Sequence, residues 1–224
     1  MKKVIAMVPV RGGSQRVPRK NTRPFAGTTL LDLKLDMLKG VSGIDDIVVS
    51  TDCEECMAIG RKHDVTIHER DAHYASSVVT NDQHWRHIAS VTPGDIVFMT
   101  QVTSPLVRRS THTRALRNYL DSLGQYDSLN SVTEEKKFLW LDGKPINYDV
   151  NKTPRSQDLP GIVSLNFAIT IIDRELMEKR GNVIGESPQF VVLDKTESVD
   201  IDDEDDFQTA EAFFKRLGRD WLFG

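Results

Sequence analysis

The sequence predicts an α/β fold in which a mostly parallel central sheet is covered by helices on both faces. Two observations carry this prediction. Short apolar runs alternate with amphipathic stretches along the first half of the chain, which is the rhythm of β-α-β units. The runs are apolar at nearly every position, as is typical of strands buried on both faces. The chain has 224 residues, and we expect one main domain, 1–224, with an insertion.

Three strands, each followed by a helix, are expected in the first half. The apolar runs mark the strands, and the amphipathic stretches between them mark the helices. Thr28 and Thr29 ahead of Leu30 have the pattern of a helix start, and Gly40 that of a helix stop. The expected strand and helix pairs are 4–10 with 30–38, 47–49 with 53–62, and 96–99 with 111–123.

The rhythm changes after Asp127. The segment Phe138–Ile146 has strand-like residues on both sides of Asp142-Gly143, which predicts a β-hairpin turned at that dipeptide. We therefore expect an insertion over residues 134–160. The α/β pattern then resumes with a long apolar strand at Ile162–Ile172.

Two helices are expected after that strand. One begins at Asp173, and the last covers Asp203–Leu217. The last helix is predicted from apolar residues that recur at helical spacing on one face. These residues are Phe207, Ala210, Phe213, Phe214 and Leu217.

Composition limits the class of protein and its location. The chain is 39 % hydrophobic and 28 % charged, as in soluble globular proteins. No apolar run approaches the roughly 20 residues that cross a bilayer, so no membrane partner is expected. With Cys53 and Cys56 as the only cysteines, no disulfide framework is expected, and the cytoplasm is the expected location. The formal net charge of −4 argues against nucleic-acid binding.

The two cysteines allow one rival class. Their Cys-x-x-Cys spacing at a helix start is that of thiol redox proteins, in which the thiol pKa is lowered. A redox protein would require both thiols to cycle under mild oxidant.

Charge is distributed unequally along the chain. No acidic residue precedes Asp32, whereas seven basic residues do. Between Asp194 and Asp206 there are eight carboxylates and one lysine. We therefore expect a polyanionic ligand to bind near the basic start of the chain and a metal cation to bind near the acidic run.

The expected first strand leads into a cationic loop, Arg11–Asn21, that contains Gly12 and Gly13. Ligands of open α/β sheets bind beyond the carboxyl ends of the strands, which is where this loop lies. Paired glycines allow backbone N–H groups to approach phosphate oxygens, and Arg11 and Lys20 supply positive charge. The spacing matches neither a Walker P-loop nor a dinucleotide fingerprint. The alternative is a solvated basic loop.

Asp200 and Asp202 form a candidate metal pair. In an extended segment, residues two apart project to the same face, so both carboxylates can bind one hard cation such as Mg²⁺ (or Mn²⁺). The alternative is an acidic helix start, in which Asp202 or Asp203 caps the helix that follows.

Several segments together resemble one family. The opening segment Val8–Asn21 closely resembles the signature of the acylneuraminate cytidylyltransferases, the CMP-sialic acid synthetase family. Further segments recur in the order of that family along nearly the whole chain, and several motifs in order are more specific than any one. They are Val48–Asp52, Gln101–Leu106, Arg155–Pro160 and Asp200–Asp202.

The resemblance implies a Rossmann-like nucleotidyltransferase that binds CTP and transfers CMP to an acidic acceptor. It places the triphosphate on the first loop, and it makes Arg11, Lys20 and Asp202 the expected catalytic residues. The expected CTP-binding residues are Arg11, Gly12, Gly13, Ser14, Lys20 and Asn21, with Arg70 and Thr80 or Asn81 near the cytidine. The expected acceptor-binding residues are Gln101, Thr103, Ser104, Arg155, Gln157 and Asn166, and the expected metal ligands are Asp200 and Asp202.

The acceptor itself stays open. Typical members of the family read Asn-Gly-Ala-Ile-Tyr where this chain has Asn166-Phe167-Ala168-Ile169-Thr170, so a pocket of altered shape is expected. The acceptor is then a nonulosonic (sialic-type) acid other than the standard one, or a small phosphonate. A CTP-binding protein without turnover is a further alternative.

Arg155 has its own alternative, which is a surface ion pair with Asp158 or Asp149. The resemblance also implies a homodimer formed through the inserted segment.

Overall fold

A sheet of seven strands forms the centre of the computed structural model, which describes residues 2–14, 16–76 and 78–224. The strand order is β3-β2-β1-β4-β8-β5-β9. In this sheet β8 runs antiparallel to both of its neighbours, and the other recorded pairings are parallel. The mostly parallel sheet predicted from the sequence is therefore confirmed. Its strands are β1 (Val4–Pro9), β2 (Asp46–Thr51), β3 (Thr66–Glu69), β4 (Ile96–Thr100), β5 (Ser128–Glu135), β8 (Ile162–Asp173) and β9 (Pro188–Leu193).

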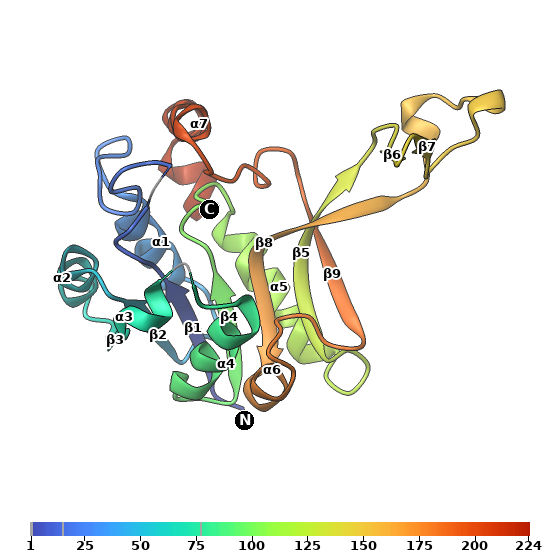
Figure 1. The fold of residues 1–224 in the computed structure, drawn as a ribbon. Coiled ribbons are helices and arrows are strands. Elements are labelled where there is room, and N and C mark those ends of the chain that lie inside the picture. Colours follow the sequence, from blue (N-terminus) through green and yellow to red (C-terminus); the bar gives the residue numbers. More distant parts are fainter. Residues whose placement is uncertain (1, 15, 77) are drawn as a thin grey trace.

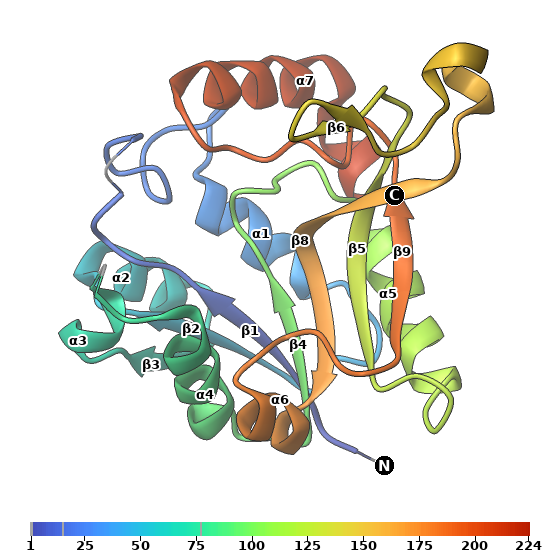
Figure 2. The ribbon, with the colours of Figure 1, turned by 45° about the vertical axis from the view of Figure 1, so that its right-hand side comes forward.

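Helices cover both faces of this sheet (Figures 1 and 2). Successive side chains of a strand point to opposite faces, so β1 sends Val4, Ala6 and Val8 into one apolar layer and Ile5 and Met7 into the other. The first layer packs against α1 (Leu30–Leu38), α2 (Glu54–Lys62), α5 (Arg109–Asp121) and α7 (Glu204–Phe223). The second packs against α4 (Asn81–Val91) and α6 (Arg174–Arg180). A one-turn helix, α3 (Ala72–Ala75), precedes α4.

The strand β5 was not predicted, because its sequence is polar. Its polar residues Ser128, Asn130 and Ser131 are buried, and their side chains bond to neighbouring segments. Asn130 accepts a hydrogen bond from Thr170 Oγ1 at 3.3 Å, and Ser128 Oγ accepts one from the N–H of Gly185 at 2.8 Å. These bonds satisfy Asn130 Oδ1 and Ser128 Oγ, whereas Asn130 Nδ2 has no hydrogen-bond partner among the described residues.

An arm leaves the sheet between β5 and β8. It spans residues 136–161 and carries β6 (Trp140–Leu141), β7 (Lys144–Pro145) and two short 3-10 helices, η1 (Val150–Lys152) and η2 (Ser156–Asp158). Figure 1 shows it projecting away from the body of the molecule. The predicted hairpin turn is confirmed, since β6 pairs with β7 and the turn residues Asp142 and Gly143 have φ of 50° and 76°.

The last helix is longer than predicted, reaching Phe223 with non-helical geometry at Gly218. Asp203 caps its start by accepting the N–H of Asp206 at 3.0 Å. Of the two caps considered for this helix, the structure therefore selects Asp203, which leaves the Asp202 carboxylate available for other partners. In the described parts of the chain, every helix is too short or too polar to span a membrane.

Candidate active site

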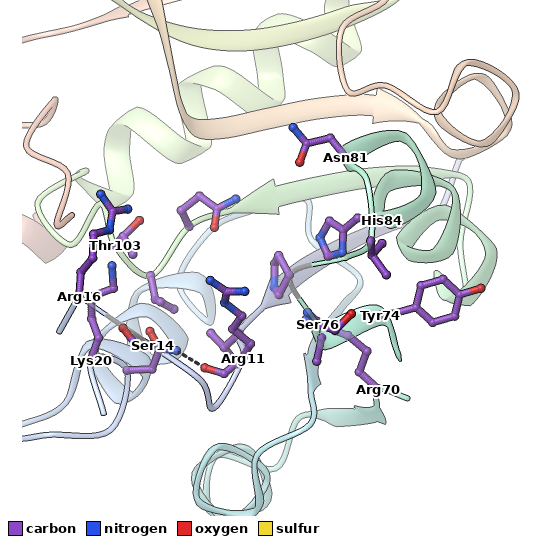
Figure 3. A pocket seen from close by; sticks show the side chains of 17 residues that line it. Arg11, Ser14, Arg16, Lys20, Arg70, Tyr74, Ser76, Asn81, His84 and Thr103 are labelled. Carbon is purple, nitrogen blue, oxygen red and sulfur yellow. Dashed lines mark hydrogen bonds between the residues drawn. The ribbon is translucent and has the colours of Figure 1, made fainter. Parts of the chain in front are cut away.

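A cavity of about 610 Å³ lies at the carboxyl ends of β1 and β4, where the sheet order reverses (Figure 3). Such a switch point is where open α/β sheets bind their ligands. We call it the first cavity. The residues after β1 contribute Arg11, Ser14, Arg16, Lys20 and Asn21, the residues after β4 contribute Gln101, Val102 and Thr103, and the segment from β3 to α4 contributes Arg70, Tyr74, Asn81 and His84 among others.

The loop after β1 is held by internal hydrogen bonds. The N–H of Gly12 donates to Asp52 Oδ1 at 3.0 Å, and the N–H of Ser14 donates to Gly12 O at 3.0 Å. A Cβ on Gly12 would lie 3.1 Å from the Cβ of Cys53, so the loop packs closely against the start of α2 there. A Cβ on Gly13 would meet none of the described residues within 4 Å. The N–H groups of Gly12 and Ser14 are thus already hydrogen-bonded within the protein. The positive charge of the loop lies in its side chains.

The two oppositely charged ends of the sequence meet at this loop. Arg16 forms an ion pair with Asp202 at 2.6 Å, and Lys20 Nζ donates to the carbonyl oxygen of Ile201 at 2.6 Å. A third pair joins Arg23 to Glu204 at 2.7 Å. The predicted cationic loop and acidic run are therefore adjacent in space although about 180 residues separate them in the chain.

Lys20 lies at the centre of these charges. Burial lowers its pKa most, while Asp200 and Asp202 oppose that shift and Arg16 and Arg11 add to it. Both aspartates and two arginines are therefore close enough to act on one ammonium group. A phosphate chain placed there would meet three cationic side chains.

Asp200 and Asp202 offer exposed carboxylate oxygens, which are the donors that a hard cation prefers. Ile201 between them is buried and both aspartates are exposed, as expected for alternating residues of an extended segment. Ser104 Oγ donates to Asp200 at 3.4 Å. The described residues contain no cluster of three or more acidic, histidine or cysteine ligands. Mg²⁺ commonly binds through one or two carboxylates and completes its shell with phosphate oxygens and water, so this donor set fits it.

The other end of the first cavity contains Arg70, Asn81 and His84. Arg70 is buried and donates to Ser50 Oγ at 3.2 Å, and burial lowers its pKa to about 10. Burial, with Arg70 nearby, lowers the pKa of His84 to about 4, so the imidazole is neutral at pH 7. The sequence alone gives no signal that singles out His84, and only the fold reveals it in the cavity wall. Of Thr80 and Asn81, Asn81 lines the cavity, while Thr80 caps α4.

A second cavity of about 590 Å³ adjoins the first, and Asn81, Gln101 and Thr103 line both. Among the residues predicted to bind the acceptor, Gln101, Thr103 and Asn166 line it. The predicted metal ligand Asp200 also lines it. Its remaining lining comes from Asp82, Trp85, Phe167, Gly181, Asn182, Val183 and Ile184.

Three residues predicted to bind the acceptor lie elsewhere. Ser104 is buried behind Asp200. Arg155 and Gln157 lie on the arm, beside and within η2, and contribute to the lining of neither cavity. Arg155 pairs with Asp158 at 2.7 Å, which is the surface ion pair considered as its alternative. Within one chain the arm carries these two side chains away from the acceptor cavity, so their predicted contact with the acceptor is not made there.

A buried lysine beneath the site was missed. Lys34 is 2 % exposed and donates to the carbonyl oxygen of Ser104 at 3.0 Å and to Thr100 Oγ1 at 3.3 Å. Burial lowers its pKa to about 7. It therefore supports the turn that carries Thr103 and Ser104. The sequence contained a signal, since Lys34 stands four residues from both Leu30 and Leu38, on the apolar face of its helix.

The second cysteine of the Cys-x-x-Cys pair is buried. Burial raises the pKa of the Cys56 thiol to about 12, so almost no thiolate is present at neutral pH. Redox and metal-binding cysteines require the thiolate. The Cys56 thiol therefore does not suit the cycling thiol pair that a redox protein would require.

The fold is that of the nucleotidyltransferases. The chain matches the sequence model of the cytidylyltransferases over residues 5–154, and it belongs to that family. The resemblance seen in the sequence is thereby confirmed at the level of the family.

Individual relatives agree with this assignment. The chain is 27 % identical to N-acylneuraminate cytidylyltransferase A of Danio rerio, over 96 % of this chain and 51 % of that protein. It is 22 % identical to post-translational flagellin modification protein B of Campylobacter coli, over 96 % of each. The chain thus spans about half the length of several curated relatives that it matches.

Solved structures share the fold. A CMP:2-keto-3-deoxy-manno-octonic acid synthetase complexed with CTP superposes with a TM-score of 0.71 at 12 % identity, covering 96 % of this chain and 100 % of that one. A cytidylyltransferase from Leptospira borgpetersenii gives a TM-score of 0.69 at 18 % identity, covering 100 % of this chain and 91 % of that one.

Proposed function

We propose that this protein transfers CMP from CTP to an acidic acceptor of the nonulosonic (sialic) type and releases pyrophosphate. One observation carries the proposal. Cationic side chains from the start of the sequence line the first cavity and contact Asp202 and Ile201 from near its end, and Asp200 lines the adjoining second cavity. Membership of the cytidylyltransferase family supports CTP as the donor.

CTP lies along the first cavity in this proposal. Its triphosphate contacts Arg11, Ser14 and Lys20, with Arg16 nearby, and its cytidine lies toward Arg70 and Asn81. Because the Gly12 and Ser14 amides are already bonded, the side chains supply most of the phosphate contacts. The neutral His84 ring adds a polar group that does not depend on pH near neutrality.

The chemistry is an in-line displacement. An acceptor hydroxyl oxygen attacks the α-phosphorus, a new phosphorus–oxygen bond forms, and the bond to the β-phosphate oxygen breaks. Pyrophosphate leaves with that electron pair, and the hydroxyl proton passes to water. Arg11 and Lys20 stabilise the charge that develops on the leaving phosphates, and the two cavities hold the reactants in line. Asp200 and Asp202 would hold Mg²⁺ (or Mn²⁺), which supplies charge neutralisation and a lowered hydroxyl pKa when bound.

The acceptor occupies the second cavity, near Gln101, Thr103 and Asn166. Within the described residues this cavity contains Asp82 and Asp200 but no lysine, arginine or histidine. Because these two carboxylates repel a doubly charged phosphonate more than a singly charged acid, the acid is favoured over the phosphonate. A CTP-binding protein without turnover is disfavoured because Lys20, Asp200 and Asp202 are assembled around one site.

The assembly and location follow from other features. The arm exposes Trp140, Leu141 and Ile146, which are 54 %, 62 % and 56 % accessible, and exposed apolar residues of this kind mark protein interfaces. A second copy of the chain is the proposed partner of this surface, giving a homodimer. A monomeric mass at micromolar concentration in light scattering would count against it.

The unpaired Cys53 and Cys56 suit a reducing cytoplasm, which is the proposed location.

A pyrophosphate-release assay tests the function. CTP, Mg²⁺ and a panel of nonulosonic acids and phosphonates are supplied in turn, with ATP, GTP and UTP as donor controls. Release is expected with CTP and at least one acid, and it is expected to require that acid. CTP binding with no release for any acceptor would favour the protein without turnover instead.

A further inference from the structure

The strand β8 is irregular where it passes the second cavity. Its pairing with β5 joins Asn130 to Thr170 and Val132 to Leu165, so residues 166–169 of β8 stand opposite Ser131 alone. Bulges of this kind redirect side chains and are frequent beside active sites. Phe167 lies within this bulge and lines the second cavity.

The backbone of Phe167 is strained. Its φ is 54°, in the left-handed region that glycine adopts freely and that a bulky side chain rarely enters. Glycine at this position would provide the same bulge without the steric cost. The chain instead keeps an aromatic ring there, and the ring is 38 % exposed.

Hydrogen bonds on both sides enforce this conformation. On the side of β5, the N–H of Ile169 donates to Ser131 Oγ at 2.9 Å, and Asn166 Nδ2 donates to Thr133 Oγ1 at 3.0 Å. On the side of β4, Thr100 Oγ1 donates to the carbonyl oxygen of Ala168 at 3.0 Å. Strain that persists because its surroundings impose it is characteristic of functional sites.

The lining of the cavity shows what the ring can recognise. Trp85, Val183 and Ile184 belong to the apolar layer on the α4 and α6 face, and together with Phe167 they give the second cavity a large apolar surface. The acidic groups are Asp82 and Asp200, and within the described parts of the chain no basic side chain balances them. A charged group on a ligand would therefore be placed toward the cationic first cavity, and an uncharged, apolar part toward Phe167 and Trp85.

We infer that Phe167 is a specificity-determining residue of the acceptor site, selecting acids whose remaining substituents are uncharged and apolar, such as methyl and acylamino groups, over polyhydroxylated ones. The inference rests on the proposed function for the identity of the second cavity. Contact between the aromatic ring and CH groups of such substituents strengthens binding of the acid. Hydroxyl groups placed against the same ring lose their hydrogen bonds to water, which weakens binding.

Two nine-carbon acids of equal charge and configuration test this. N-acetylneuraminate is the polyhydroxylated probe. N,N′-diacetyllegionaminate carries an acylamino group and a methyl group at two positions where N-acetylneuraminate carries hydroxyl groups. Binding of each is measured by calorimetry with CMP present, so that the result does not depend on turnover. The proteins are the wild type, Phe167→Gly, and the control Phe190→Ala, which removes an exposed ring from β9 that lines neither cavity.

The wild type and Phe190→Ala are expected to bind the diacetyl acid roughly tenfold or more tightly than the other, and Phe167→Gly is expected to lose that preference. Because glycine relieves the strain at φ 54°, the melting temperature of Phe167→Gly should not fall, which separates lost recognition from lost folding. Equal binding of both acids by the wild type, binding of neither, or an unchanged preference in Phe167→Gly overturns the inference.

Pyrophosphate release with CTP and Mg²⁺ in the same samples separates the two proposals. A Phe167-dependent binding preference without release would count against CMP transfer and leave the recognition role in place. Release with no Phe167-dependent preference would leave the transfer in place and remove the role of Phe167.

Discussion

Replacing the buried Lys34 with methionine should change how stability depends on pH. Burial lowers the Lys34 pKa from its ordinary value of 10.5 to about 7, so between these values the unfolded chain holds a proton that the folded chain does not. Stability of the wild type therefore rises with pH across this window, by up to about 1.4 kcal/mol per pH unit. The full cost of charging Lys34 in the folded protein is at most roughly 5 kcal/mol, reached below pH 7.

Urea unfolding of the wild type and Lys34→Met at pH 7.5, 8.5 and 9.5 measures this. The wild type should gain about 2 to 3 kcal/mol relative to Lys34→Met over that range. The lost hydrogen bonds to Ser104 and Thr100 lower the stability of the variant by an amount that does not depend on pH, so they do not affect the slope. Lys39→Met, which removes an exposed lysine at the end of the same helix, is the control for a lost positive charge. Parallel stability curves for the wild type and Lys34→Met would refute the reasoning.

Three further predictions concern the cap of α7, the cationic loop and the buried cysteine. Asp203→Ala should lower the unfolding free energy by about 1 kcal/mol because it removes the cap of α7, with the Michaelis constant for CTP unchanged; a shift in that constant instead would place Asp203 in the site. Lys20→Ala should lower the turnover number roughly a hundredfold or more in the pyrophosphate-release assay, since it removes the cation at the centre of the site, and unchanged kinetics would remove the loop from the mechanism. The Cys56 thiol should resist alkylation at pH 8 in the folded protein and react once it is unfolded, as followed by mass spectrometry, because its pKa is about 12; fast labelling of the native protein would contradict that value.

The parts of the fold that sequence reasoning found are those where one physical signal dominates. β1, α1 and β4 are apolar on the faces that the core requires, so their periodicity alone predicts them. The hairpin in the arm was predicted because Asp142-Gly143 can adopt positive φ at both positions. In each case the residues that decide the structure are neighbours in the chain.

What was missed depends on contacts between distant segments. β5 is polar in sequence and becomes an interior strand of the sheet because β8 and the segment before β9 donate hydrogen bonds to its buried Asn130 and Ser128. Arg155 has the residue type for binding a carboxylate, but its position is set by an arm whose direction the sequence does not encode locally. The sequence revealed that a phenylalanine replaces glycine at position 167, whereas the strained backbone that makes this replacement informative is visible only in the bulge between β8 and β5.

The cavity residues divide in the same way. The loop Arg11–Asn21 and the pair Asp200 and Asp202 were found because their charges are concentrated in short stretches of sequence. His84 and Lys34 were not found as site residues, because one histidine on an amphipathic helix and one lysine in an apolar stretch have many ordinary explanations. Only the packing of α4 and α1 against the carboxyl end of the sheet brings them to the site.

A double-mutant cycle on CTP affinity tests the central claim, that Lys20 and Asp202 act on the same triphosphate. Binding of CTP in Mg²⁺ is measured by calorimetry for Lys20→Ala, Asp202→Asn and the double variant, with Asp205→Asn as a control from the same acidic run. Groups that share one ligand are expected to couple by at least about 1 kcal/mol, while the control binds like the wild type. Strictly additive losses, or an Asp202→Asn variant that binds CTP as tightly as the wild type, would contradict the account.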